Sequence, residues 1–131
     1  MKIVINDRFG GFSLSHAGVM RYAELKGITL YPYVDDITKK VYGEKPFPEY
    51  PWLHYSTLPA QNEDDLNRNY FTDTDIPRDD PALIKLVEEM GERANGDCAH
   101  LKVIEIPDGI DFEIEEYDGN EWVAEKHRTW R

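Results

Sequence analysis

The residues best suited to ligand chemistry lie in a glycine-containing loop near the start of the chain. Arg8 precedes Gly10 and Gly11, and Ser13 follows them. Glycines let a backbone approach a ligand closely, and a helix N-terminus after the loop would favour an anion. The loop has neither the P-loop pattern GxxxxGK(S/T) nor the dinucleotide fingerprint GxGxxG. It therefore indicates either a contact for a small anionic ligand or a tight turn between a strand and a helix.

A second candidate segment, residues 73–80, places Arg78 among aspartates. Spaced carboxylates can hold Mg²⁺ or Ca²⁺, but a calcium loop needs Asp or Asn at its fifth position and Gly at its sixth. This chain has Pro77 and Arg78 there, so we predict no metal site. An arginine held in such a segment can instead brace the loop or bind a carboxylate or phosphate.

The third candidate is the basic cluster at the end of the chain, residues 126–131. An arginine beside an aromatic ring can stack on a base or hold a phosphate, and it can equally dock on an acidic surface. Our hypothesis is that this cluster and the two loops surround one cleft. The predicted ligand-binding residues are then Arg8, Gly10, Gly11, Ser13, Tyr70, Arg78, Trp122 and Arg128.

No pattern in the sequence indicates a catalytic centre. The four histidines lack metal-ligand spacing, and no Ser-His-Asp order with a nucleophile elbow occurs. Cys98 and His100 would share one face of a strand, but such a pair needs a third, orienting group. We predict no catalytic residue, no metal and no cofactor, and we favour binding over catalysis.

Composition limits the class of partner. Asp and Glu number 26 against 15 Lys and Arg, which gives a net charge of −11. This charge disfavours nucleic acid polymers and anionic membranes, and it suits a basic partner. No stretch approaches the ~20 apolar residues of a membrane-spanning helix, and the N-terminal MKIVIN is too short and charged for a signal peptide. A single cysteine excludes an intrachain disulfide, so we predict a cytoplasmic protein without a membrane partner.

The elements that must position these residues begin with a buried strand at 2–6. A helix follows, which one of the serines of the glycine loop caps and which ends at Gly27. A hairpin over 28–34 and 37–42 comes next, with Pro32 at an edge or a bulge.

Residues 43–80 differ from the rest, because prolines interrupt aromatic residues over a long segment. We predict an irregular segment with one short helical turn from Glu63 toward Arg68. Long loops of this kind are usually functional or disordered. Their aromatic content favours packing on the domain, on a ligand or on a second subunit, and hence a homo-oligomer.

A helix over 81–94 opens the last third of the chain, with Asp80 as its cap and Pro81 at its first position. A three-stranded meander then begins at 100–106. Asp118-Gly119 is a strong hairpin signal, and a two-residue turn there fixes the register of the last two strands. The predicted opposite pairs are Ile114 with Val123, Glu115 with Trp122, Glu116 with Glu121 and Asp111 with Lys126. The two glutamates repel each other unless a cation or a partner lies beside them.

These elements predict a single α+β domain over residues 1–131. Its largely antiparallel sheet carries two helices on one side, in the order β-α-β-β-(long loop)-α-β-β-β.

Three stretches of the sequence resemble a family of small uncharacterised bacteriophage proteins. They are KIVIN with GGFSLS, RDDPALI leading into VEE, and IEEYDG with EWVAEKHRTW. The resemblance covers most of the chain outside 43–70, and the last stretch is the most specific. It implies an accessory protein in the cytoplasm of the bacterial host. Proteins in that setting often blunt host defences, either by sequestering a nucleotide signal or by blocking a defence enzyme.

We expect a noncatalytic binder of a small anionic ligand such as a nucleotide signal. One alternative is an inhibitor of a host protein, whose acidic segment from Glu105 to Glu121 covers a basic surface. Another is a small enzyme that processes phosphate esters.

Overall fold

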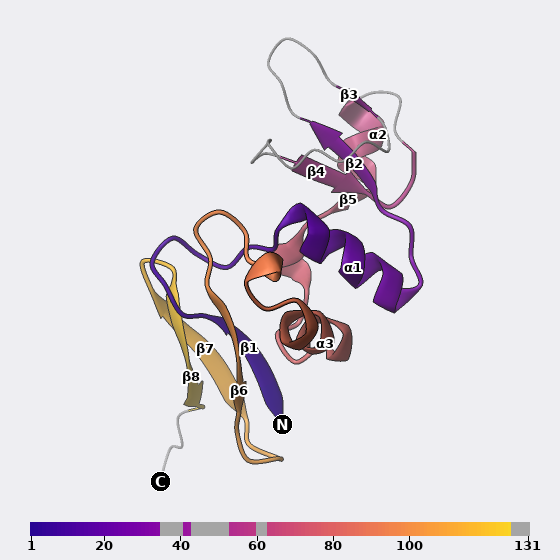
Figure 1. The fold of residues 1–131 in the computed structure, drawn as a ribbon. Helices are drawn as coiled ribbons and strands as arrows, with labels where there is room; N and C mark the ends of the chain where they lie inside the picture. The colour runs from indigo at the N-terminus through magenta and orange to yellow at the C-terminus, as the bar shows by residue number, and fades with distance from the viewer. Residues whose placement is uncertain (35–40, 43–52, 60–62, 127–131) are drawn as a thin grey trace, which may run out of the picture.

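A computed structural model of the chain describes residues 1–34, 41–42, 53–59 and 63–126, and it confirms the predicted α+β class (Figure 1). All paired strands are antiparallel. The elements are β1 (Lys2–Asn6), α1 (His16–Lys26), β2 (Tyr31–Val34), β3 (Val41–Tyr42), β4 (Leu53–Ser56), α2 (Glu63–Arg68), β5 (Tyr70–Phe71), η1 (Asp73–Asp75), α3 (Pro81–Met90), η2 (Gly91–Ala94), β6 (Leu101–Glu105), β7 (Phe112–Tyr117) and β8 (Asn120–Glu125), where η denotes a 3₁₀ turn.

The described strands form three sheets rather than the one sheet expected. β1 pairs with β6, the order β3-β2-β4-β5 makes a second sheet, and β7 pairs with β8. The prediction of a meander over the last three strands was therefore wrong, because β6 pairs with β1 and not with β7. At the end of that pair, the Met1 amino group donates to the Ile106 carbonyl and the Ile106 N–H donates to the Met1 carbonyl, both at 2.8 Å. The buried strand β1 needs a partner along its backbone, and the apolar β6 supplies it.

Local capping signals place the two longer helices. The Ser15 hydroxyl accepts from the Gly18 N–H at 3.0 Å at the start of α1, and Gly27 ends that helix at φ 69°. Asp80 caps α3 by accepting from the Ala82 N–H at 2.8 Å. The α-helix ends at Met90, earlier than the predicted 94, because Gly91 takes φ 58° and the chain continues as η2.

The segment 43–80 contains more regular structure than the sequence predicted. Its described residues form β4, α2, β5 and η1, and β4 pairs with both β2 and β5. The short helical turn from Glu63 to Arg68 is confirmed as α2. The expectation of a homo-oligomer depended on the whole segment, of which residues 43–52 and 60–62 lie outside the described residues.

The core lies where α1, α3 and β1 meet, and α1 separates α3 from the four-stranded sheet (Figure 1). Val4, Leu83 and Leu86 are fully buried there. The four-stranded sheet joins the same core, since Tyr55 of β4 belongs to the cluster and the Phe71 ring stacks on Tyr22 with 5.9 Å between centroids. The glycine loop and the turn of the β7–β8 hairpin meet at the C-terminal end of β1, where the Asn6 side chain contacts both.

Candidate functional site

The β7–β8 hairpin has the register predicted from its Asp118-Gly119 turn. Glu115 lies opposite Trp122 and Glu116 opposite Glu121. Successive side chains of a strand point to opposite faces, so the hairpin has two distinct sides. We define the inner face by Ile114, Glu116, Glu121 and Val123, and the outer face by Glu113, Glu115, Tyr117 and Trp122.

Arg78 binds the inner face and explains why the opposed glutamates are tolerated. Its guanidinium forms two parallel bonds to the Glu121 carboxylate, at 2.5 and 2.8 Å. The guanidinium carbon also lies 3.8 Å from the centre of the Phe12 ring. The side chains of Arg78 and Glu121 are only 18% and 9% exposed. Arg78 is therefore the cation that the like-charged pair requires. Its guanidinium is already engaged within the chain, by the Glu121 carboxylate and by the Phe12 ring.

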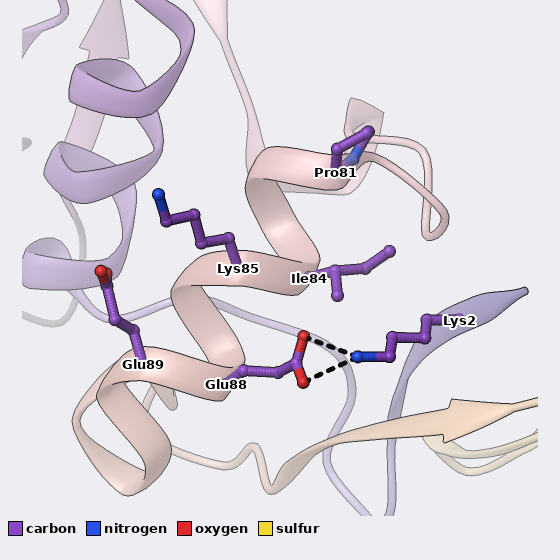
Figure 2. Close-up of a pocket in the computed structure, with 6 residues that line it drawn as sticks. All are labelled: Lys2, Pro81, Ile84, Lys85, Glu88 and Glu89. Carbon is purple, nitrogen blue, oxygen red and sulfur yellow. Dashed lines mark hydrogen bonds and ion pairs between the residues drawn. The ribbon is translucent and has the colours of Figure 1, made fainter.

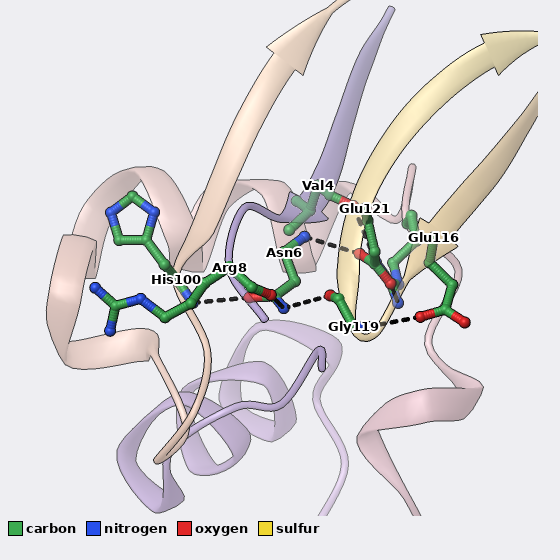
Figure 3. A network of polar contacts seen from close by, with 8 residues as sticks. Val4, Asn6, Arg8, His100, Glu116, Gly119 and Glu121 are labelled. Carbon is green, nitrogen blue, oxygen red and sulfur yellow. Dashed lines mark hydrogen bonds and ion pairs between the residues drawn. The ribbon is translucent and has the colours of Figure 1, made fainter. Parts of the chain in front are cut away.

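Asn6, which is fully buried at the end of β1, ties three segments together (Figure 3). Its amide nitrogen donates to the carbonyls of Arg8 and Gly119 at 2.7 Å, and its amide oxygen accepts from the His100 N–H at 2.8 Å. The Asn6 backbone N–H donates to Glu121 at 2.8 Å. One side chain thus fixes the glycine loop, the hairpin turn and the start of β6 relative to one another.

The glycine loop packs tightly against the hairpin turn. The Gly10 N–H donates to the Asp118 carbonyl at 3.0 Å. A Cβ added at Gly119 would overlap the Gly11 nitrogen, and one added at Gly10 would lie 2.6 Å from the Cys98 Cβ. Glycine is required here because two backbones approach each other, which is the turn interpretation of the loop. Ser13 is in the same junction, where its carbonyl accepts from the Gly96 N–H at 2.9 Å.

The described members of the predicted ligand-binding set do not meet in one cleft. Arg78 lies on the inner side of the hairpin, whereas Trp122 is on the outer face. Tyr70 belongs to the four-stranded sheet, where its hydroxyl contacts His54 Nδ1 at 3.1 Å. Arg8 is exposed beside His100 (Figure 3), and Arg128 lies outside the described residues.

The outer face carries the largest group of neighbouring exposed aromatic side chains in the described part of the chain. Phe9, Tyr117 and Trp122 are 58%, 71% and 45% exposed. The Phe9 and Tyr117 rings meet edge to face with 6.4 Å between centroids, and Trp122 is the diagonal neighbour of Tyr117 across the strands. Together they expose about 350 Å² of aromatic surface, which is in the range of functional patches on monomers.

The outer face is also strongly acidic. Glu113 and Glu115 are exposed on it, and the sequence around the hairpin, from Val103 to Ala124, contains no Lys or Arg. The Trp122 indole N–H donates to Glu115 at 2.9 Å. The exposed rings thus lie beside Glu113 and Glu115, which form no ion pair among the described residues. Sequence reasoning missed Phe9 and Tyr117, although strand alternation from the hairpin turn already assigns Tyr117 and Trp122 to one face.

A shallow, open depression of about 550 Å³ lies elsewhere, between β1 and the exposed side of α3 (Figure 2). Lys2 spans its edge and binds the Glu88 carboxylate at 3.0 Å. Both side chains are about half exposed, so water screens this pair. None of the predicted ligand-binding residues lines the depression.

Titratable groups meet where α1 begins against the four-stranded sheet. His16 Nδ1 lies 2.9 Å from the Tyr55 hydroxyl, and the two rings stack with 5.9 Å between centroids. Burial lowers the pKa of His16 and raises the pKa of Tyr55. Burial also raises the pKa of Asp73, against the lowering effect of the Leu14 N–H that donates to its carboxylate at 2.8 Å. These contacts join the sheet to the helical core.

Within the described residues, no group of three or more His, Cys, Asp or Glu side chains is arranged to hold a metal ion. None of the described helices has the length and apolar character needed to span a membrane. Comparisons of the chain with protein-family models, curated proteins and solved structures found no match.

Proposed function

We propose that the protein is a noncatalytic binding protein whose outer face docks on a basic surface of another protein. The observation that carries this proposal is the exposed aromatic row of Phe9, Tyr117 and Trp122 set among carboxylates. Tyrosine and tryptophan are enriched at the energetic centres of protein interfaces. Carboxylates around them steer a basic partner and disfavour acidic ones.

The rigid support of the hairpin favours the same function. Glu121 and Gly119 attach the hairpin to β1 through Asn6. Arg78 binds Glu121 on the inner face of the hairpin. A face held in this way loses little conformational freedom on binding, which improves affinity. The resemblance to bacteriophage proteins makes a host protein the natural partner, and blocking that protein is the biological role we propose.

A small anionic ligand, the function favoured by sequence alone, has less support from the geometry. That hypothesis needs Arg78 as an anion clamp, but Arg78 is engaged by Glu121 and Phe12. The glycine loop contacts the hairpin turn where a ligand would approach. Nucleotide binding stays a prediction, which calorimetry with cyclic and linear nucleotides would test.

Selection of peptides from a random library on the immobilised protein tests the docking proposal. We expect enrichment of basic peptides, with binding that weakens as salt concentration rises. The double variant Tyr117→Ser with Trp122→Ser should lose at least tenfold in affinity for an enriched peptide. Both side chains are exposed, so the variant should fold normally, which circular dichroism checks.

The matched control is Leu58→Ser, because Leu58 is 55% exposed but follows β4 of the four-stranded sheet and is not part of the β7–β8 hairpin. It should bind the enriched peptide as the parent protein does. Enrichment of acidic peptides, no enrichment at all, or equal binding by the double variant would each contradict the proposal.

A further inference from the structure

The Trp122 ring on the outer face lies beside a carboxylate. The Trp122 indole is anchored at one edge, because its N–H donates to Glu115 at 2.9 Å. That bond occupies the only polar group of the ring. Trp122 is 45% exposed, so part of its apolar surface is accessible to solvent.

Glu113 is the second carboxylate beside the ring. It lies two residues from Glu115 on β7 and is therefore on the same face, diagonal to Trp122. It is exposed and belongs to none of the ion pairs among the described residues. A cation lying on the indole would thus have one carboxylate at the ring edge and another across the strands.

The chain already binds one arginine with this combination of groups. Arg78 stacks on the Phe12 ring at 3.8 Å while its two nitrogens bind the Glu121 carboxylate at 2.5 and 2.8 Å. Glu121 precedes Trp122 on β8, so the two arrangements would lie on opposite sides of the same strand. A planar guanidinium can stack on a ring and bind a carboxylate with two donors, whereas a lysine ammonium is a hydrated point charge.

We infer that the outer face recognises an arginine side chain of its partner, which stacks on Trp122 and binds Glu113, in preference to lysine. This inference rests on the proposed docking function and adds its specificity. A guanidinium on an exposed ring gains stacking and cation–π energy that corresponds to about two- to fivefold in affinity.

Two synthetic peptides of equal length and charge test the inference, one alternating arginine with glycine and one alternating lysine with glycine. Their affinities for the intact protein are measured by calorimetry at low salt. We expect the arginine peptide to bind about two- to fivefold more tightly. Equal affinities, or tighter binding of the lysine peptide, would overturn the arginine preference and leave the docking function intact. Absence of binding by both peptides would count against the docking function as well.

Three variants locate the preference on the molecule. Trp122→Leu keeps an apolar side chain but removes the π-system, so the preference for the arginine peptide should shrink. Glu113→Gln keeps the shape but removes the charge, and it should weaken the arginine peptide more than the lysine peptide. Asp64→Asn removes an exposed carboxylate from α2 and should preserve the preference. An arginine preference that survives both Trp122→Leu and Glu113→Gln would refute the assignment to this face.

Discussion

The contact between Arg78 and Glu121 is expected to be the strongest polar bond between the hairpin and the body of the protein. Arg78→Met removes the guanidinium while keeping an unbranched apolar stem on Phe12. The Glu121 carboxylate, 9% exposed, then loses its cation and keeps only the Asn6 N–H among its described partners. Breaking one half of a fully buried pair costs about 3–5 kcal/mol. Because Arg78 is 18% exposed, we expect the lower end, about 3 kcal/mol, in the free energy of unfolding.

The double variant Arg78→Met with Glu121→Met separates the pair from its surroundings. Removing both charges leaves no uncompensated carboxylate, so the double variant should be more stable than the sum of the single effects predicts, by about 1–2 kcal/mol. Arg21→Met is the matched control, because Arg21 binds Glu89 at 2.9 Å on the surface with exposures of 32% and 42%. Water screens that exposed pair, so Arg21→Met should cost much less stability than Arg78→Met.

Urea denaturation followed by circular dichroism gives the free energies of unfolding, and hydrogen exchange shows where protection is lost. We expect the amides of β7 and β8 in Arg78→Met to exchange faster than those of α3. A loss of stability no larger than in Arg21→Met, or strict additivity in the double variant, would refute the reasoning.

Three further predictions concern the loop junction and the titratable groups. Gly119→Ala should destabilise the protein by about 2 kcal/mol more than Gly109→Ala in thermal or urea unfolding, since both glycines have positive φ but only a Cβ at Gly119 meets the glycine loop. Burial lowers the pKa of His16, so the unfolded state binds the proton more readily than the folded state. The stability of the parent protein should therefore fall as the pH drops below about 6.5, and His16→Gln should abolish this loss. An equal pH dependence of unfolding in the parent and this variant would contradict that assignment. Tyr22→Phe should cost about 1 kcal/mol by removing the bond to Asp80. Burial, and to a lesser extent the bond to Asp80, raises the pKa of Tyr22 to about 12. Above about pH 10 the unfolded state therefore loses the Tyr22 proton more readily than the folded state. In unfolding experiments at rising pH, the stability advantage of the parent over this variant should shrink between about pH 10 and 12.

Features that depend on neighbouring residues could be predicted from the sequence. The serine cap of the first helix (predicted for either Ser13 or Ser15), the Asp80-Pro81 helix start and the Asp118-Gly119 turn each follow from the conformation or hydrogen bonding of a few adjacent residues. The register of the hairpin could then be predicted from the Asp118-Gly119 turn, because a two-residue turn leaves one way to pair the strands. It also predicted the repulsion between Glu116 and Glu121, which the structure confirms as an opposed pair.

Features that join distant segments could not be predicted. Nothing in the spacing of β1 and β6 shows that they pair, and Arg78 reaches Glu121 from 43 residues away. The role of the glycine loop could not be predicted for the same reason, because the loop packs against the Gly119 turn, which follows it by more than a hundred residues. A ligand and a distant backbone both demand glycine, so the residue types alone do not distinguish them.

The bond from the Asn6 N–H to Glu121 spans 115 positions, which has a consequence for biosynthesis. A ribosome delivers β1 first, yet the partner strand β6 and then Glu121 emerge only after nearly everything else has been translated. The earliest-made strand must wait with an open edge, so the fold completes after most of the chain has left the exit tunnel. Nascent chains stalled before residue 101 should therefore be sensitive to protease and bound by chaperones, whereas the released protein of 131 residues should be resistant.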